Sequence, residues 1–105
     1  MKVRCIIKRP DEKYGHVANI ITSLRNLQSI VDGHIETVSC GGSTVIICNE
    51  EGKIRKLQPN FQIGSGLFAD WICGEAIIIG VDGEGFSDLQ ISFDTLKRLL
   101  ESWGN

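Results

Sequence analysis

Hydrophobic and polar residues alternate along several stretches of the chain, which predicts β-strands. Residues 1–8 alternate with a period close to two, and residues 34–40 do so again. Gly41-Gly42-Ser43 then predicts a tight turn into a returning strand over 45–49, whose residues 45–48 are apolar. Residues 53–57 alternate charged and apolar side chains. We therefore expect a three-strand meander over 34–57, with a loop over 60–66 once Pro59 has ended the β-ladder.

Residues 16–31 fit two interpretations. Their apolar positions can form one face of a single helix. Alternatively, 16–21 is a strand that pairs with 1–8, and Thr22 caps a helix that runs to Val31. We favour the second interpretation because Thr22-Ser23 is the better start signal and Gly33 follows as a stop. The apolar residues that this helix should bury are Leu24, Leu27, Ile30 and Val31.

The second half of the chain contains its most apolar run, within residues 74–81. Such a run predicts a central strand that is covered on both faces. Residues 68–72 suggest one helical turn or a lip, 82–85 a loop, and 93–103 an amphipathic helix capped by Ser92. The fold class expected is α+β: a single small domain over 1–105, with a mostly antiparallel or mixed sheet of about five to six strands and two helices.

Composition narrows the class of protein. With 105 residues, 42% of them hydrophobic and 23% charged, the chain resembles an ordinary globular domain. A net charge of −2 predicts no general nucleic-acid binding and no membrane binding. No apolar stretch has membrane-spanning length, and Arg4 and Lys8 bracket a run too short for a signal peptide. We expect a cytoplasmic protein, and a homo-oligomer because few helices are available to cover the sheet.

The cysteines Cys5, Cys40, Cys48 and Cys73 lie in or beside apolar runs. No pair has C-x-x-C spacing, and the chain has only two histidines. We expect reduced thiols that pack as small hydrophobic side chains, with no metal site and no cofactor.

A polar ridge within 44–60 carries the strongest candidates for ligand binding. Lys53 and Arg55 would project from one face of a strand and could hold a phosphate, although cations there can also be a solvated edge. Trp71 could stack on a base or cover the core. Asn49 can equally be a turn residue, and Asn60 can lock a loop. The candidate ligand-binding residues are Asn49, Glu50, Lys53, Arg55, Lys56, Asn60 and Trp71.

No residue is predicted to be catalytic. Glu50 and Glu51 are adjacent, so on a strand they would face apart and could not act as a pair. Residues 82–85 lack the glycine spacing of a phosphate-binding loop. No nucleophile–base arrangement is evident, which disfavours an enzyme.

Several segments together resemble a small uncharacterised domain family of bacteriophages, plasmids and firmicute genomes. They are 47–53 followed by 57–60, 30–33 before Ile35-Glu36, 70–74 and 80–83. The resemblance implies a phage or mobile-element origin, a cytoplasmic host and a neighbourhood of anti-defence genes. Cys73 and a longer loop over 61–67 depart from the usual pattern, which affects the expected pocket shape more than the fold.

The resemblance and the polar ridge lead to three hypotheses. The first is a non-enzymatic sponge that sequesters a nucleotide immune signal of the host, with a small phosphorylated nucleotide-like ligand as its partner. The alternative is a protein-binding inhibitor or antirestriction accessory module that acts on a host factor. The third is a small hydrolase of a nucleotide signal. A nucleotide binder should need Lys53, Arg55 and Trp71, whereas a protein inhibitor need not.

Overall fold

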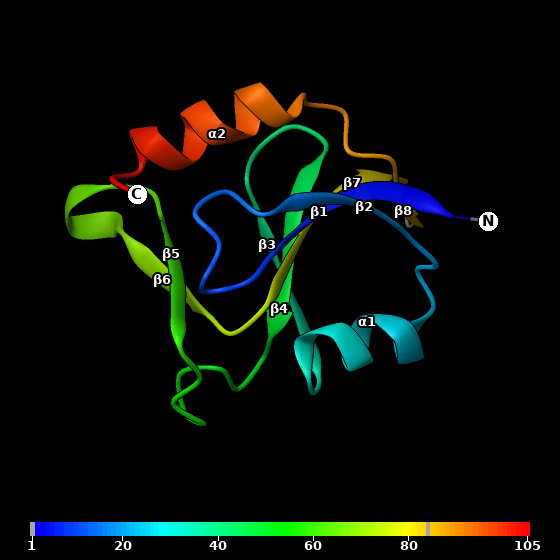
Figure 1. The fold of residues 1–105 in the computed structure, drawn as a ribbon, viewed down its shortest axis with the longest axis horizontal. Helices are drawn as coiled ribbons and strands as arrows, with labels where there is room; N and C mark the ends of the chain where they lie inside the picture. The colour runs from blue at the N-terminus through cyan, green and yellow to red at the C-terminus, as the bar shows by residue number, and fades with distance from the viewer. Residues whose placement is uncertain (1, 84) are drawn as a thin grey trace.

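A six-stranded antiparallel sheet forms the centre of the fold and carries one helix on each face (Figure 1). The computed structural model describes residues 2–83 and 85–105. Its main sheet has the order β2 (His16–Ile20), β1 (Val3–Lys8), β7 (Ala76–Asp82), β4 (Thr44–Asn49), β3 (Ile35–Ser39), and β8 (Gly85–Ser87) also pairs with β7. The remaining elements are α1 (Leu24–Val31), α2 (Phe93–Ser102), the 3-10 turn η1 (Gly66–Phe68), and a second sheet of β5 (Pro59–Ile63) and β6 (Asp70–Cys73). The predicted α+β class is confirmed.

Strand β7 is the central strand, as its apolar run predicts. Ile77 and Ile79 join the core cluster that α1 covers, whereas Ile78 joins the cluster that α2 covers. This alternation follows from the period of two along a strand. Both faces of β7 are therefore covered within one chain, which removes the reason for expecting a homo-oligomer.

Helix α1 confirms the split interpretation of residues 16–31. Strand β2 pairs antiparallel with β1. The predicted cap, Thr22, is wrong by one residue: Ser23 caps α1, and its hydroxyl accepts a hydrogen bond from the Asn26 N–H at 3.2 Å. Leu27 and Val31 are buried and Ile30 is partly buried, as expected. Leu24, two turns before Val31 on the same stripe, is 58% exposed, so its predicted burial is wrong. It lies outside the cluster that packs on the sheet.

Residues 53–57 do not form the predicted third strand. They belong to a compact turn, in which the N–H of Arg55 donates to the carbonyl of Glu51 at 2.8 Å. Lys56 takes a left-handed conformation with φ of 56°, which a strand excludes. The turn packs on β6 at Gly52, where a Cβ would lie 2.8 Å from the Cys73 carbonyl oxygen. The meander is therefore a two-strand hairpin of β3 and β4.

Residues 59–63 form β5 rather than the predicted loop. Pro59 is its first residue, a position that proline tolerates. Residues 68–72 were predicted as one helical turn or a lip, but most of them form the partner strand β6, and the 3-10 turn η1 precedes it. Phe61 and Ile72 face each other across the two strands and are buried with the α2-side core.

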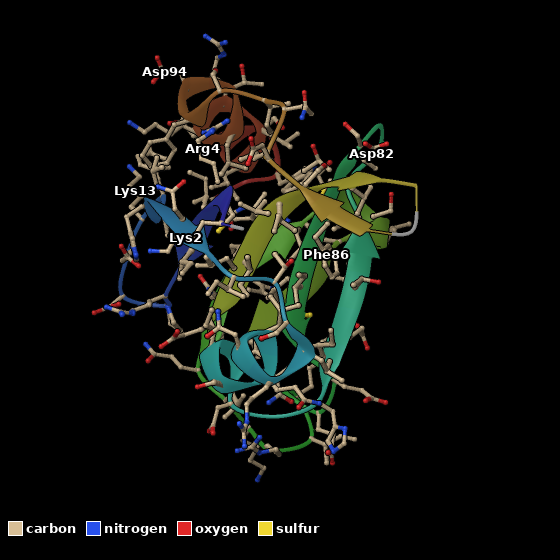
Figure 2. All side chains as sticks on the ribbon, turned by 90° about the vertical axis from the view of Figure 1, so that its right-hand side faces the viewer. Lys2, Arg4, Lys13, Asp82, Phe86 and Asp94 are labelled. Carbon is tan, nitrogen blue, oxygen red and sulfur yellow. The ribbon has the colours of Figure 1, made fainter. Side chains whose placement is uncertain are left out.

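In the C-terminal third, the observed elements match those predicted from the sequence, except for β8. Ser92 caps α2, and Leu96 and Leu100 are buried. The loop predicted over 82–85 is the connection from β7 to β8, and Glu84 within it lies outside the described residues. Strand β8 was not predicted, and its Phe86 packs with the α1-side cluster (Figure 2).

All four cysteines are free thiols, as expected for packing residues. Cys5 and Cys48 are buried, whereas Cys40 and Cys73 are partly exposed. Burial raises the pKa of each of the Cys5, Cys40 and Cys48 thiols to about 11. Over residues 2–83 and 85–105, neither helix is long and apolar enough to cross a membrane.

Candidate functional site

The first candidate pocket, of about 250 Å³, lies where β4 ends, between the turn that follows it and β6. Four of the seven predicted residues line it: Asn49, Glu50, Lys53 and Trp71. The other lining residues are Glu36, Val38, Cys48, Gly52, Ile54, Asp70, Ile72 and Cys73. We call this the first pocket.

Asn49 holds the fold together rather than facing the pocket with free polar atoms. Its side chain is buried, and Nδ2 donates to the carbonyls of Val31 and Asp32, both at 3.0 Å. Its Oδ1 accepts from the Glu51 N–H at 2.8 Å. These bonds tie the C-terminal end of α1 to β4, and they favour the turn interpretation of Asn49 over ligand binding.

Lys53 and Arg55 do not form the predicted phosphate clamp. Since 53–57 is a turn, their side chains diverge to different carboxylates. Lys53 pairs with Asp70, and this hydrogen bond raises the pKa of Lys53 and lowers that of Asp70. Arg55 Nη1 donates to the Asp32 carbonyl at 2.7 Å, and Nη2 lies 3.3 Å from the Asp32 carboxylate. Both pairs are exposed and contribute little stability.

The charges around the first pocket are mostly negative. Three carboxylates line it, from Glu36, Glu50 and Asp70, against the single ammonium of Lys53. Carboxylates accept hydrogen bonds from hydroxyl and amino groups and repel phosphate. The pocket therefore suits the base and sugar of a nucleotide better than its phosphates.

A second depression, of about 420 Å³, adjoins the first pocket. It holds the predicted residue Asn60, and Trp71 lines both cavities. The remaining lining residues are Lys8, Pro10, Asp11, Glu12, Lys13, Gly104 and Asn105. Arg55 and Lys56 line neither cavity. The predicted ridge is thus divided between two cavities and a turn.

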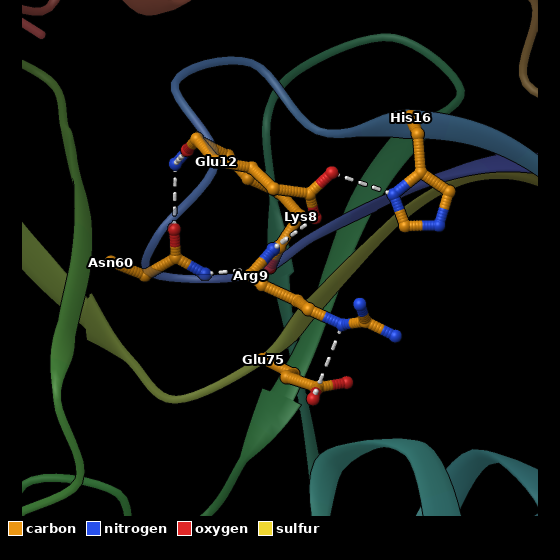
Figure 3. Close-up of polar contacts among 6 residues, drawn as sticks. All are labelled: Lys8, Arg9, Glu12, His16, Asn60 and Glu75. Atoms are coloured by element: carbon orange, nitrogen blue, oxygen red, sulfur yellow. Dashed lines mark hydrogen bonds and ion pairs between the residues drawn. The ribbon is translucent and has the colours of Figure 1, made fainter.

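Lys8 and Asn60 form a reciprocal pair at the second depression (Figure 3). Lys8 Nζ donates to Asn60 Oδ1 and to the Glu12 carbonyl, both at 2.7 Å. Asn60 Nδ2 donates to the carbonyls of Lys8 at 2.7 Å and Gly74 at 2.8 Å. Nζ also lies 5.4 Å from the centre of the Phe61 ring. Asn60 therefore locks three segments together, one of the two roles foreseen for it.

Lys8 was not among the predicted site residues, although it is only 2% exposed. Burial lowers its pKa, while the charges of Glu12 and Asp11 act in the opposite direction. The burial of Lys8 could have been predicted from the sequence. Lys8 lies two positions after Ile6, so on a strand both side chains share one face, and Ile6 belongs to the core.

Charged groups around Lys8 are largely engaged with each other (Figure 3). Glu12 Oε2 lies 2.8 Å from His16 Nδ1, and its Oε1 accepts from the Arg9 N–H at 3.0 Å. The Arg9 side chain lies 3.6 Å from Glu75. Desolvation opposes ionisation of Glu12, but the hydrogen bonds from His16 and Arg9 lower its pKa overall. In the part of the chain that the structure describes, no three His, Cys, Asp or Glu side chains gather as a metal site would require.

Comparison with known proteins identifies the domain family of the chain and no individual relative. Neither the curated proteins nor the solved structures contain a match to this chain. One family model, DUF3846, described as a domain of unknown function, matches residues 1–101. This match covers nearly the whole sequence and confirms that the resemblance was to a domain family without an assigned function. The chain belongs to the DUF3846 family.

Proposed function

We propose that this protein binds a small nucleotide-like ligand and sequesters it without cleaving it. The observation that carries the proposal is Trp71, which is 47% exposed and forms a wall of both cavities. A large exposed ring is a suitable platform for a nucleobase, and stacking contributes about 1–3 kcal/mol per base.

The first pocket supports this assignment on one side of the ring. Carboxylates of Glu36, Glu50 and Asp70 can accept hydrogen bonds from the amino and hydroxyl groups of a nucleoside. Val38 and Ile54 add apolar surface. A volume of about 250 Å³ is small for a whole nucleotide, so the rest of the ligand would extend past Trp71 into the second depression.

The proposed biological role is anti-defence. The resemblance to proteins of phages and plasmids supports a sponge for a nucleotide immune signal in the host cytoplasm. Sequestration requires that the ligand bind tightly and dissociate slowly. It requires no catalytic group.

The test is recovery of the ligand. Protein is incubated with cyclic dinucleotides, cyclic trinucleotides and cyclic ADP-ribose isomers, freed of unbound ligand, and heat-denatured, and the supernatant is analysed by liquid chromatography. Intact ligand should be recovered. Trp71→Ala should weaken binding roughly five- to 150-fold, the equivalent of one stacked base. Trp71→Phe should retain most of the affinity, since it preserves a flat ring.

Leu67→Ala is the matched control, because Leu67 is 99% exposed and lines neither cavity. Its affinity should equal that of the unmodified protein. Recovery of a converted ligand would overturn the proposal in favour of the hydrolase. A failure to retain any ligand of the panel would overturn it in favour of the protein-binding inhibitor.

A further inference from the structure

The ammonium group of Lys8 is buried against uncharged oxygens. Of its three N–H groups, one donates to the Glu12 carbonyl and one to the Asn60 amide. Within residues 2–83 and 85–105, no carboxylate accepts a hydrogen bond from Nζ. Burial lowers the pKa of Lys8, whereas the carboxylates of Glu12 and Asp11 raise it through their charge without a hydrogen bond to the ammonium group. A buried cation with no hydrogen-bonded anion is costly, and the cost falls when an anion reaches it.

The surroundings of Lys8 leave room for such an anion. Lys8 lines the second depression together with Lys13, whose exposed side chain lies on the turn between β1 and β2 (Figure 2). Glu12 and Asp11 also line the depression: the carboxylate of Glu12 is held by His16 and by the Arg9 N–H, and Asp11 lies at the exposed rim. A phosphate here competes with two carboxylates for two ammonium groups. Two amide side chains, of Asn60 and Asn105, complete the polar lining.

We propose that Lys8 and Lys13 bind the phosphate of the ligand whose base stacks on Trp71. This inference rests on the proposed function. It moves the phosphate away from Lys53 and Arg55, where the sequence predicted it. The phosphate lies on the Lys8 side of Trp71, whereas the base and sugar lie on the Lys53–Asp70 side. Lys8 supplies a fixed charge from a buried position, and Lys13 supplies a second charge from the rim.

The probe for this site is inorganic pyrophosphate, which carries phosphate without a base. Titration into the full chain is followed by NMR of the lysine ammonium groups, with Lys8 assigned from its hydrogen bonds and burial. The Lys8 signal should shift saturably. Lys13→Glu should weaken pyrophosphate binding roughly tenfold or more, because it replaces a charge-assisted contact with a repulsion.

Lys2→Glu is the matched control, since it makes the same change of charge just before Val3, at the opposite end of β1, and lines neither cavity. It should weaken binding by less than about twofold through general electrostatics. Equal effects of Lys13→Glu and Lys2→Glu would overturn the inference. So would a Lys8 signal that stays fixed at millimolar pyrophosphate, because Lys8 would then be a structural tie.

The same titration separates this inference from the proposed function. Recovery of a nucleotide and movement of the Lys8 signal are scored separately on the unmodified protein. If a nucleotide is retained and the Lys8 signal does not move, the phosphate assignment fails and the binding function stands. If pyrophosphate moves the signal and no nucleotide is retained, the phosphate site stands and the proposed function fails.

Discussion

Two asparagine side chains hold strand ends to segments that are distant in the sequence. Asn49 joins β4 to the end of α1, and Asn60 joins β5 to β1 and to the residue after β6. Both atoms of each amide are used, so each side chain acts as a cross-link of the backbone. Buried carbonyls rarely remain without a donor, and these amides supply one.

Replacing Asn49 by alanine should lower the free energy of unfolding by about 1–3 kcal/mol, because the carbonyls of Val31 and Asp32 lose their donor while remaining enclosed. Urea denaturation followed by far-UV circular dichroism measures the change. Asn19→Ala, at an exposed position on β2, is the control and should alter stability by less than about 0.5 kcal/mol. An Asn49→Ala variant as stable as the control would show that these hydrogen bonds do not contribute to stability.

These residue-scale roles could not be predicted from the sequence. The sequence marks Asn49 and Asn60 as polar groups at turns, but their partners lie 18 and 52 positions away. Lys53 and Arg55 likewise find carboxylates 17 and 23 positions away. Whether a polar side chain is free for a ligand depends on such distant partners, which local spacing does not encode.

At the scale of helices and strands, the periodicity of apolar residues predicted most of the long elements. The alternation of β1 and β3 and the stripe of α2 follow directly from the period of each element, and the apolar run of β4 predicts a buried strand. Residues 53–57 also alternate, but a solvated turn accommodates the same polar positions, and the left-handed Lys56 breaks the extended chain. Strand β8 has three residues, too few for a period to show.

The contact between β7 and the segment after β8 should be the least tolerant of added volume. A Cβ on Gly80 would lie 2.2 Å from the Asp88 carbonyl oxygen, and backbone cannot yield as a side chain can. Gly80→Ala should therefore cost about 1–3 kcal/mol or more and lower the melting temperature. It would also disturb the Arg4 N–H bond to Asp88 at 2.8 Å.

Gly85→Ala is the control for this prediction. A Cβ at Gly85 would have the Asp82 carbonyl oxygen at 3.9 Å as its near neighbour, an ordinary contact. Thermal unfolding followed by circular dichroism should show Gly85→Ala close to the unmodified protein. If both variants melted at the same temperature, the close approach at Gly80 would have no energetic consequence.

At the scale of the whole molecule, the chain supplies its own covering layers. Helix α1 covers one face of the sheet, and α2 with the β5–β6 ribbon covers the other. Homo-oligomerisation remains a prediction, and its original reason no longer applies. The outer edges of β2 and β3 end the main sheet and are where a second copy could pair.

Three thiols with raised pKa values predict how stability depends on alkaline pH. Cys5, Cys40 and Cys48 have native pKa values raised from 9.0 to about 11, so an unfolded chain loses these protons first. Their contribution to stability is complete below pH 9 and is lost as pH rises toward 11. The free energy of unfolding should fall across this range, as measured by urea denaturation under reducing conditions.

Cys5→Ala isolates one of these groups and should show a shallower fall than the unmodified protein. Lys8 acts in the opposite direction: its native pKa is lowered from 10.5, so its penalty on folding shrinks as pH rises through that native value. The comparison of slopes cancels the Lys8 contribution, which both proteins share. Identical slopes in the two proteins would contradict the assignment of a buried, protonated thiol at Cys5.

The position of β7 in the chain sets the order in which the sheet can be completed during synthesis. The β1–β2 hairpin and the β3–β4 hairpin are made first, yet they have no ladder with each other and are joined through β7. Both halves of the sheet therefore emerge from the ribosome before the strand that unites them. Until Ala76 to Asp82 have emerged, each half presents an open inner edge, and nascent chains on neighbouring ribosomes can pair through it.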